Sequence, residues 1–75
     1  SAESWDQHYG NMHSTDRNIS MKAFETHNAL IKEHGVDKVN VAFAAAVARH
    51  KARIAAAPPG SKESADPFAG NSPAP

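Results

Sequence analysis

The stretch SMKAFETHNALIKEHG, residues 20–35, has the pattern of one amphipathic helix that ends at a glycine. At about 100° per residue, its polar positions gather on one arc, which holds Lys22, Glu25, Thr26, Ala29, Lys32 and Glu33. The remaining arc exceeds the roughly 100° that contact with one neighbouring helix requires. It includes Met21, Phe24, His27, Asn28, Leu30, Ile31 and His34. We therefore expect this helix to contact more than one neighbour.

Capping residues define the limits of this helix, which we place at about residues 20–34. Asp16 and Ser20 are both suitable N-caps, because their side chains can accept a hydrogen bond from the first turn. Gly35 suits the left-handed position that follows a helix C-terminus. A separate helix can therefore begin almost immediately after this glycine.

A second helix is predicted from about residue 38 to residue 56, with Asp37 as its N-cap. Its many alanines favour helix, and Pro58 stops it because proline cannot donate and restricts the residue before it. One stripe of this helix holds Val39, Phe43, Val47, His50 and Ile54, and a face of small residues holds Val41, Ala44, Ala45, Ala48, Ala52 and Ala55. The small face permits close helix approach, or it simply reflects alanine at exposed positions.

The joint between the two helices is little more than Gly35 and Val36, which leaves an antiparallel hairpin or a helix-turn-helix corner. We favour the hairpin. The predicted fold is therefore all-α, with a two-helix antiparallel hairpin over residues 20–57. Its expected core residues are Phe24, Ile31, Phe43 and Val47.

Irregular segments are predicted on both sides of the hairpin. Residues 1–19 form an irregular N-terminal arm, although the Ser4–Gln7 capping-box spacing and Gly10 allow a short helix over residues 5–9. Residues 58–75 form an extended tail rich in Pro, Ala, Gly and Ser, which buries too little to fold alone. Phe68 in this tail, next to Pro67, has the character of a peptide anchor.

Composition excludes several classes of protein. The chain has 75 residues, so it forms at most one small domain, and it has no cysteine for disulfides or thiolate metal sites. Its formal net charge is zero, which argues against a general attraction to nucleic acid or anionic membrane. Neither a signal peptide nor an apolar run of about 20 residues is visible, so we expect a soluble chain.

Histidine is abundant, with five residues in the chain, but the spacing does not predict a metal site. His27 and His34 share a face yet lie roughly 10 Å apart along the helix axis, too far to bind one ion. The chain also lacks the Glu-x-x-His and His-x-x-x-His signatures, a nucleophile turn and a phosphate-binding loop. We expect no enzyme activity, no cofactor and no metal.

The wide apolar arcs point instead to protein contacts, because two such helices cannot cover each other fully. We expect a small structural or accessory subunit that docks onto a virion or a multisubunit complex. The predicted partner interface contains Trp5, Tyr9, His27, Asn28, His34, Val41, Ala45, Ala48 and Phe68. The alternative is a free-standing binding module, either a protein inhibitor or adaptor, or a nucleic-acid binder that uses Arg49, Lys51 and Arg53.

Overall fold

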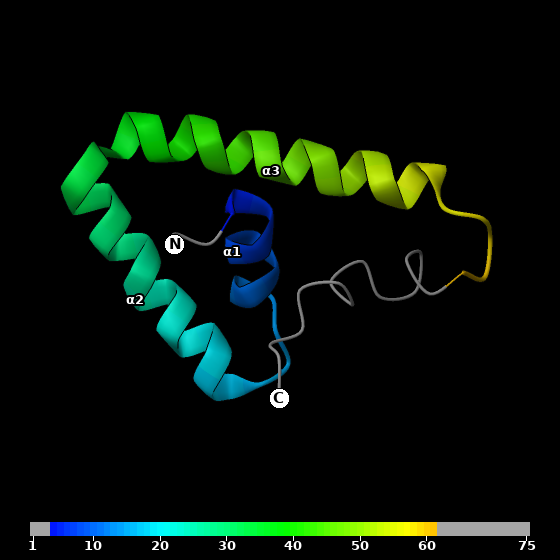
Figure 1. The fold of residues 1–75 in the computed structure, drawn as a ribbon, viewed down its shortest axis with the longest axis horizontal. Coiled ribbons are helices and arrows are strands. Elements are labelled where there is room, and N and C mark those ends of the chain that lie inside the picture. The colour runs from blue at the N-terminus through cyan, green and yellow to red at the C-terminus, as the bar shows by residue number, and fades with distance from the viewer. Residues whose placement is uncertain (1–3, 62–75) are drawn as a thin grey trace.

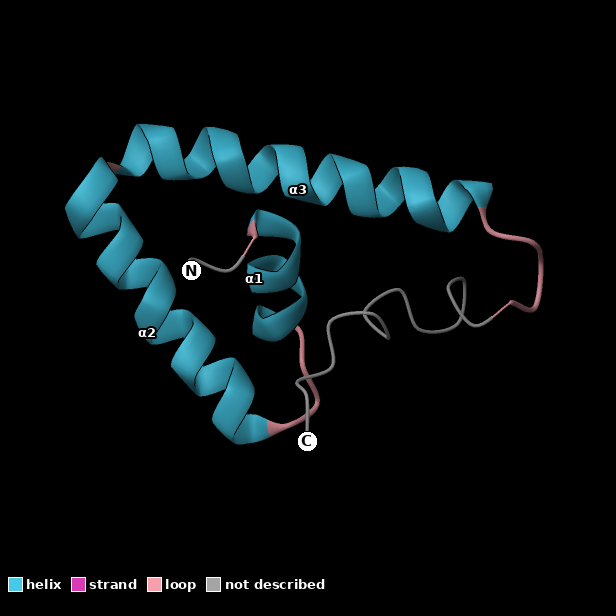
Figure 2. Ribbon diagram, viewed as in Figure 1, coloured by secondary structure: helices cyan, strands magenta, loops and turns pink. Residues whose placement is uncertain are grey.

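The structure is a computed structural model that describes residues 4–61 of the chain. This part of the chain forms three α-helices and no strand: α1 (Trp5–Met12), α2 (Arg17–His34) and α3 (Val36–Ala56) (Figure 2). The all-α prediction is therefore confirmed over the described range. The extended tail and the anchor Phe68 lie outside the described residues.

Helix α1 lies within the N-terminal arm that was predicted to be mainly irregular. Ser4 caps it, since the Ser4 hydroxyl accepts a hydrogen bond from the backbone N–H of Gln7 at 3.0 Å. The helix runs to Met12 instead of stopping at residue 9, and Gly10, expected to end it, is buried inside it.

Helix α2 begins one turn earlier than residue 20, because Asp16 acts as its N-cap. The Asp16 Oδ1 atom accepts hydrogen bonds from the backbone N–H groups of Asn18 and Ile19, at 2.9 and 3.2 Å. Ser20, the other candidate cap, lies within the helix and donates through its hydroxyl to the carbonyl of Arg17. Two satisfied first-turn donors explain why the earlier start prevails.

Gly35 alone separates α2 from α3, and it has φ 90° and ψ 147°. Its N–H donates to the Ile31 carbonyl at 2.8 Å, and its own carbonyl accepts from Val39 at 3.2 Å. Helix α3 consequently starts at Val36 without a side-chain cap, and Asp37, the expected cap, lies in its first turn. Helix α3 ends at Ala56, immediately before Ala57 and Pro58.

The three helices do not form an antiparallel hairpin. Helices α2 and α3 diverge from the Gly35 joint like the two arms of a V, and α1 lies between the arms (Figure 1). Helix α1 contacts both of its longer neighbours, while α2 and α3 contact each other mainly near their joint. The expected hairpin is thus corrected to a corner. The one-residue joint leaves α2 and α3 diverging, and α1 occupies the space between them.

Small apolar residues and histidines form the core. The buried apolar side chains of the described range are Ala23, Val39 and Ala46, and two polar side chains, His8 and His50, are buried with them. Of the residues expected in the core, Ile31, Phe43 and Val47 are half-buried. Phe24 was also expected there, but it is 55% exposed.

Candidate functional site

A pair of histidine rings joins α1 to α2. His8 Nε2 lies 3.0 Å from His27 Nδ1, and the two rings are nearly parallel, with 7° between their planes. One of these nitrogens must donate its N–H and the other must accept with its lone pair. His8 is 1% exposed and His27 is half-buried, so this hydrogen bond is partly shielded from water.

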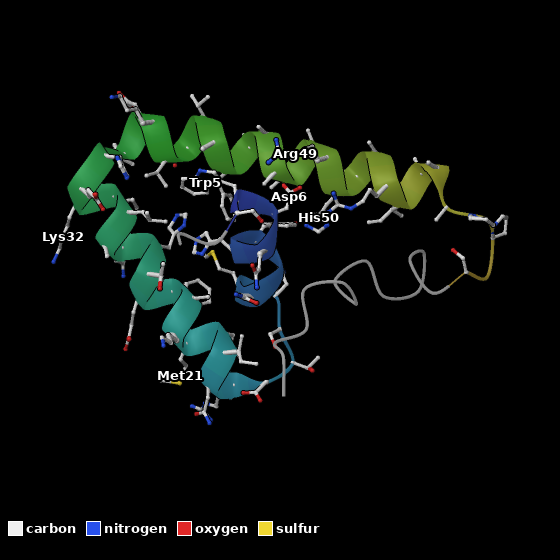
Figure 3. All side chains as sticks on the ribbon, in the orientation of Figure 1. Trp5, Asp6, Met21, Lys32, Arg49 and His50 are labelled. Carbon is white, nitrogen blue, oxygen red and sulfur yellow. The ribbon has the colours of Figure 1, made fainter. Side chains whose placement is uncertain are left out.

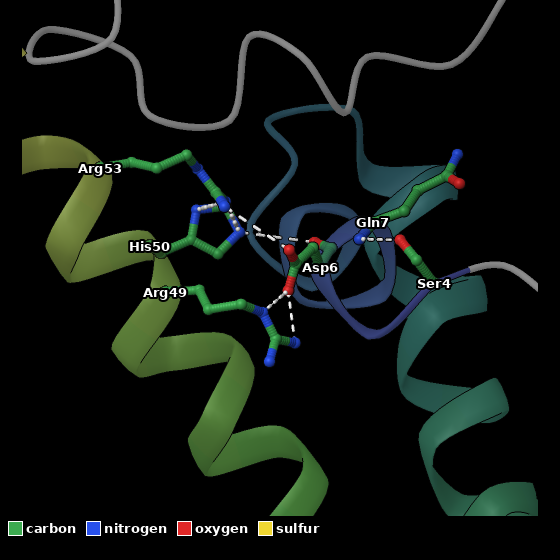
Figure 4. Close-up of polar contacts among 6 residues, drawn as sticks. All are labelled: Ser4, Asp6, Gln7, Arg49, His50 and Arg53. Atoms are coloured by element: carbon green, nitrogen blue, oxygen red, sulfur yellow. Dashed lines mark hydrogen bonds and ion pairs between the residues drawn. The ribbon is translucent and has the colours of Figure 1, made fainter.

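A second polar cluster joins α1 to α3 (Figure 4). The Asp6 carboxylate receives Arg49 Nε at 2.7 Å and Arg49 NH2 at 2.6 Å, and Arg53 NH1 lies 3.5 Å away. His50 sits beside this ion pair, with its Nε2 at 3.4 Å from the Asp6 backbone carbonyl. The Arg53 guanidinium also touches the His50 ring, with NH2 at 2.7 Å from Nδ1.

The Arg53 guanidinium lies against both ring nitrogens of His50. Its Nη2 atom is 2.7 Å from Nδ1 and 2.9 Å from Nε2. His50 is only 2% exposed, so these contacts lie at a buried ring.

Aromatic rings fill the space between the two polar clusters. Phe43 of α3 lies edge-on to Tyr9 and to His27, with ring centroids 5.2 and 5.0 Å apart. Tyr9 also contacts the His50 ring at 4.8 Å, and Trp5 stands edge-on to His8 at 5.7 Å. One face of α1 therefore inserts a row of rings between α2 and α3.

Electrostatic shifts follow these contacts. The hydrogen bond from Arg49 is the largest cause that lowers the pKa of Asp6, and it outweighs partial desolvation. The same bond raises the pKa of Arg49. Burial, followed by the adjacent His8 ring, lowers the pKa of His27. Burial is also the main cause that lowers the pKa of His50, assisted by the charge on Arg53.

The chemistry of this site is that of contact between helices. Within residues 4–61, no three or more His, Asp or Glu side chains are grouped so that they could hold a metal ion. An open, mostly apolar hollow of about 360 Å³ lies at the start of α3, lined by Asp37, Lys38, Val41 and Ala42. It contains none of the buried histidines, so it is a shallow surface feature separate from the polar clusters.

The residues predicted as a partner interface fall into two groups. Trp5, Tyr9 and His27 are half-buried and contact neighbouring helices within the chain. The second group lies on the exposed surface and consists of Asn28, His34, Val41, Ala45 and Ala48. The structure thus brings the first group together around Phe43 and leaves the second group open to solvent on α2 and α3.

Large apolar side chains are exposed beside this second group. Val41 is 73% exposed and Met21 is 54% exposed, a degree of exposure shared by Phe24 and Val36. Met21 projects from α2 away from α1 (Figure 3). The outer faces of both long helices therefore present side chains that water solvates poorly.

Sequence reasoning missed the roles of Asp6, His8 and His50 in holding α1. A signal for α1 was present, because Trp5, His8, Tyr9 and Met12 follow the i, i+3, i+4, i+7 spacing of one helix face. This apolar pattern is not apparent if His8 is counted as a polar residue. The cations proposed for nucleic acid are also placed: Arg49 and Arg53 contact Asp6, and Lys51 is exposed.

The helices and the whole chain were also compared with membrane-spanning helices and with known proteins. Over the described residues, none of the helices has both the length and the apolar character needed to cross a bilayer. No protein-family model, no curated protein and no solved structure matches the chain. The residues and their geometry are therefore the basis for a functional proposal.

Proposed function

We propose that this protein is a small non-enzymatic accessory subunit that docks onto a larger protein assembly, such as a virion or a multisubunit complex. One observation carries the proposal: two histidines share the small core, while several large apolar side chains lie on the surface. Histidines occupy the core, whereas Met21, Phe24 and Val41 are more than half exposed. Clustered exposure of large apolar side chains usually marks an interaction surface.

The small size of the core supports the same proposal. Ala23, Val39 and Ala46 are the buried apolar side chains of the described range. Burying a valine side chain stabilises a protein by only about 1.5–3 kcal/mol, and an alanine contributes less. A partner that binds the folded chain adds stability by mass action, which would offset such a small core.

Two exposed rows have the spacing by which helices dock into grooves. On α2, Met21, Phe24 and Asn28 lie at i, i+3 and i+7; on α3, Val41, Ala45 and Ala48 lie at i, i+4 and i+7. Apolar side chains in such rows supply contact area, and a polar member such as Asn28 restricts the register. We assign these two rows, the α2 row and the α3 row, to the partner.

The experiment compares two double variants of the full-length, tagged chain in the cells from which it comes. Met21→Ser with Phe24→Ser removes the apolar anchors of the α2 row. Lys22→Ser with Glu25→Ser is the matched control, because both residues are exposed on the same turns of α2. We expect the first variant to lose co-migration with a large complex on size-exclusion chromatography and the control to keep it.

Circular dichroism of the purified variants separates docking from folding. Both double variants should retain the helical signal of the wild type, because all four residues are exposed. Unchanged co-migration of the Met21→Ser, Phe24→Ser variant would refute the role of the α2 row. A wild-type chain that always elutes as a monomer from a cell extract would refute the proposed subunit role.

The alternative of nucleic-acid binding through Arg49, Lys51 and Arg53 has weaker support. Asp6 lies within ion-pair distance of both arginines, at 2.6 and 3.5 Å, and it competes with a phosphate for them. Binding through phosphate contacts would make the affinity fall steeply with salt. We expect no salt-sensitive gel shift with single- or double-stranded nucleic acid, and a steep salt dependence would favour the alternative.

A further inference from the structure

We propose that the outer face of α3 pairs with the same face of a second copy of this chain, in an antiparallel contact with twofold symmetry. The inference rests on the proposed function, because it names the partner of the α3 row and leaves the α2 row for the larger assembly. The outer face consists of six exposed residues, Val41, Ala44, Ala45, Ala48, Ala52 and Ala55.

The outer face lies opposite the side on which α3 is packed. Val39, Ala46 and His50 are the buried residues of α3, and at about 100° per residue they point away from the outer face. Helices α1 and α2 both lie on the packed side, which is below α3 in Figure 1. Within residues 4–61, no helix therefore covers the outer face.

Charged side chains are absent from the outer face over most of its length. Its six residues span an arc of about 100°, which is the width that one neighbouring helix covers. From residue 41 to residue 56, no charged residue falls inside this arc. Positions 41, 45, 48, 52 and 55 also follow the alternating steps of four and three by which two helices pack along a common seam.

Helix propensity alone does not account for this face. Alanine is favoured at exposed helix positions whatever lies outside them. Valine is a poorer helix former, yet Val41 is 73% exposed. Val41 also borders the apolar hollow of about 360 Å³ at the start of α3. A helix laid along the outer face would cover both Val41 and this hollow.

The sizes of the side chains along the outer face suit a twofold contact. In such a contact, residue i of one copy meets residue j of the other, and residue j meets residue i. With Ala44 opposite Ala45 of the second copy, Val41 lies opposite Ala48. A larger side chain then meets a smaller one at both ends of the seam, which lets the two helices approach closely.

The charges beside the outer face are complementary in the same register. Asp37 and Lys51 lie along one edge of the face at opposite ends, so antiparallel pairing brings Asp37 of each copy within one residue of the position opposite Lys51 of the other. Along the other edge Lys38 would approach Arg49, but Arg49 is already paired with Asp6 at 2.6 Å. A parallel pair would place like charges opposite each other. The charges thus favour a second copy in the antiparallel direction.

The chain has no cysteine, so disulfide trapping can test this register directly. The two copies of residue 45 differ in height by about 1.5 Å, whereas residue 52 lies opposite residue 37 and its two copies are about 22 Å apart. A disulfide needs Cα atoms within about 7 Å. We expect the purified full-length Ala45→Cys variant to form a covalent dimer on mild oxidation. Ala52→Cys, exposed on the same face, is the matched control and should stay monomeric.

Sedimentation equilibrium measures the association without a crosslink. A single pair of helices buries less than a standard interface of about 1,600 Å², so the purified wild type is followed from about 10 μM to about 1 mM. We expect a reversible equilibrium between monomer and dimer. Ala45→Glu should weaken it at least tenfold, because it places an unpaired charge in the seam. Ala29→Glu, at an exposed position of α2, is the control and should leave it unchanged.

The pairing is overturned if the wild type stays monomeric over this concentration range, or if both glutamate variants associate as the wild type does. Failure to trap Ala45→Cys, or equal trapping of Ala45→Cys and Ala52→Cys, overturns the antiparallel register. These results are independent of the proposed function, because that function is tested by co-migration of the α2 variants with a large complex. Loss of the proposed function would in turn leave dimers of the purified chain intact.

Discussion

Asp6 is the residue through which α1 is tied to two positions of α3. Its carboxylate contacts Arg49 at 2.6 Å and Arg53 at 3.5 Å, one helical turn apart on α3. Ion pairs at this degree of exposure are individually weak, because water and salt screen them. Their main effect here is on the position of α1. Because two arginines of α3 contact one carboxylate of α1, they restrict both the sliding and the rotation of α1 against α3.

Replacement of Asp6 by Asn should lower the melting temperature by a few degrees at pH 7 and low salt, and by less at high salt. The matched control is Asp37→Asn, because Asp37 also lies in the first turn of its helix and loses the same dipole interaction. Thermal melts at two salt concentrations measure the difference. Equal losses in the two variants would show that the contacts with the arginines add nothing.

The contact between Asp6 and the two arginines depends on the charge of the Asp6 carboxylate, and therefore on pH. Arg49 holds the folded-state pKa of Asp6 below the ordinary value of 3.8, so the charged form is favoured in the folded chain. The Asp6 contribution is present above pH 3.8 and is lost as the pH falls through the lowered value. Asp6→Asn should therefore lack the part of the acid-induced loss of stability that falls below pH 3.8, which a series of melts at falling pH measures.

At the scale of elements, local signals predicted the helix limits better than the helix arrangement. Asp16 was one of two expected caps, and Gly35 has the positive φ expected of it, although its ψ of 147° differs from that of the left-handed helical position. These features depend on a few neighbouring residues. The arrangement depends on α1, whose His8 and Tyr9 contact residues 19 and more positions away in the chain. No local signal reports such contacts.

The candidate site was predictable only in part for the same reason. His27 and Tyr9 were singled out, but as residues facing an external partner, whereas both contact other helices of the chain. Asp6 and Arg49 are 43 positions apart, and nothing in a single sequence indicates that they meet. Phe24 was wrongly assigned to the core for the same reason. That assignment assumed an α2–α3 hairpin, but α1 lies between these two helices.

The joint between α2 and α3 depends on Gly35, whose φ of 90° and ψ of 147° are strained for any residue with a Cβ. Gly35→Ala should destabilise the fold by about 1–3 kcal/mol, although no atom lies within 4 Å of the added methyl position. Gly60→Ala is the control, because Gly60 has a φ of 77° but lies after α3.

Urea unfolding followed by circular dichroism measures both alanine variants. A clear loss of stability in Gly35→Ala with little change in Gly60→Ala is the expected result. Equal stability of wild type and Gly35→Ala would mean that the backbone at the corner relaxes to an ordinary conformation. The corner geometry described here would then be wrong.

At the scale of the whole molecule, α1 is the element that converts two diverging helices into a packed body (Figure 1). Phe43 depends on it most clearly, since its ring meets both His8 and Tyr9 of α1. A true α2–α3 hairpin would not need α1, because each of its helices would cover the other. Removal of α1 therefore distinguishes the observed corner from the hairpin.

A shortened chain that begins at Ser14 retains the Asp16 cap and both long helices but lacks α1. We expect it to lose cooperative unfolding and to keep only a weak, gradually melting helical signal. The measurement is a far-UV circular dichroism melt beside the full chain at the same molar concentration. A cooperative transition like that of the full chain would contradict the wedge role of α1.

Helix α3 continues beyond its last buried residue, His50, and residues 51–56 are all exposed. This projecting end is anchored by the body at one side only, yet its helical backbone gives it a defined length of about 9 Å. It is therefore a suitable reference point for distance measurements. A spin label at Ala52 or Ala55, paired with one on α2, would report the angle of the corner directly.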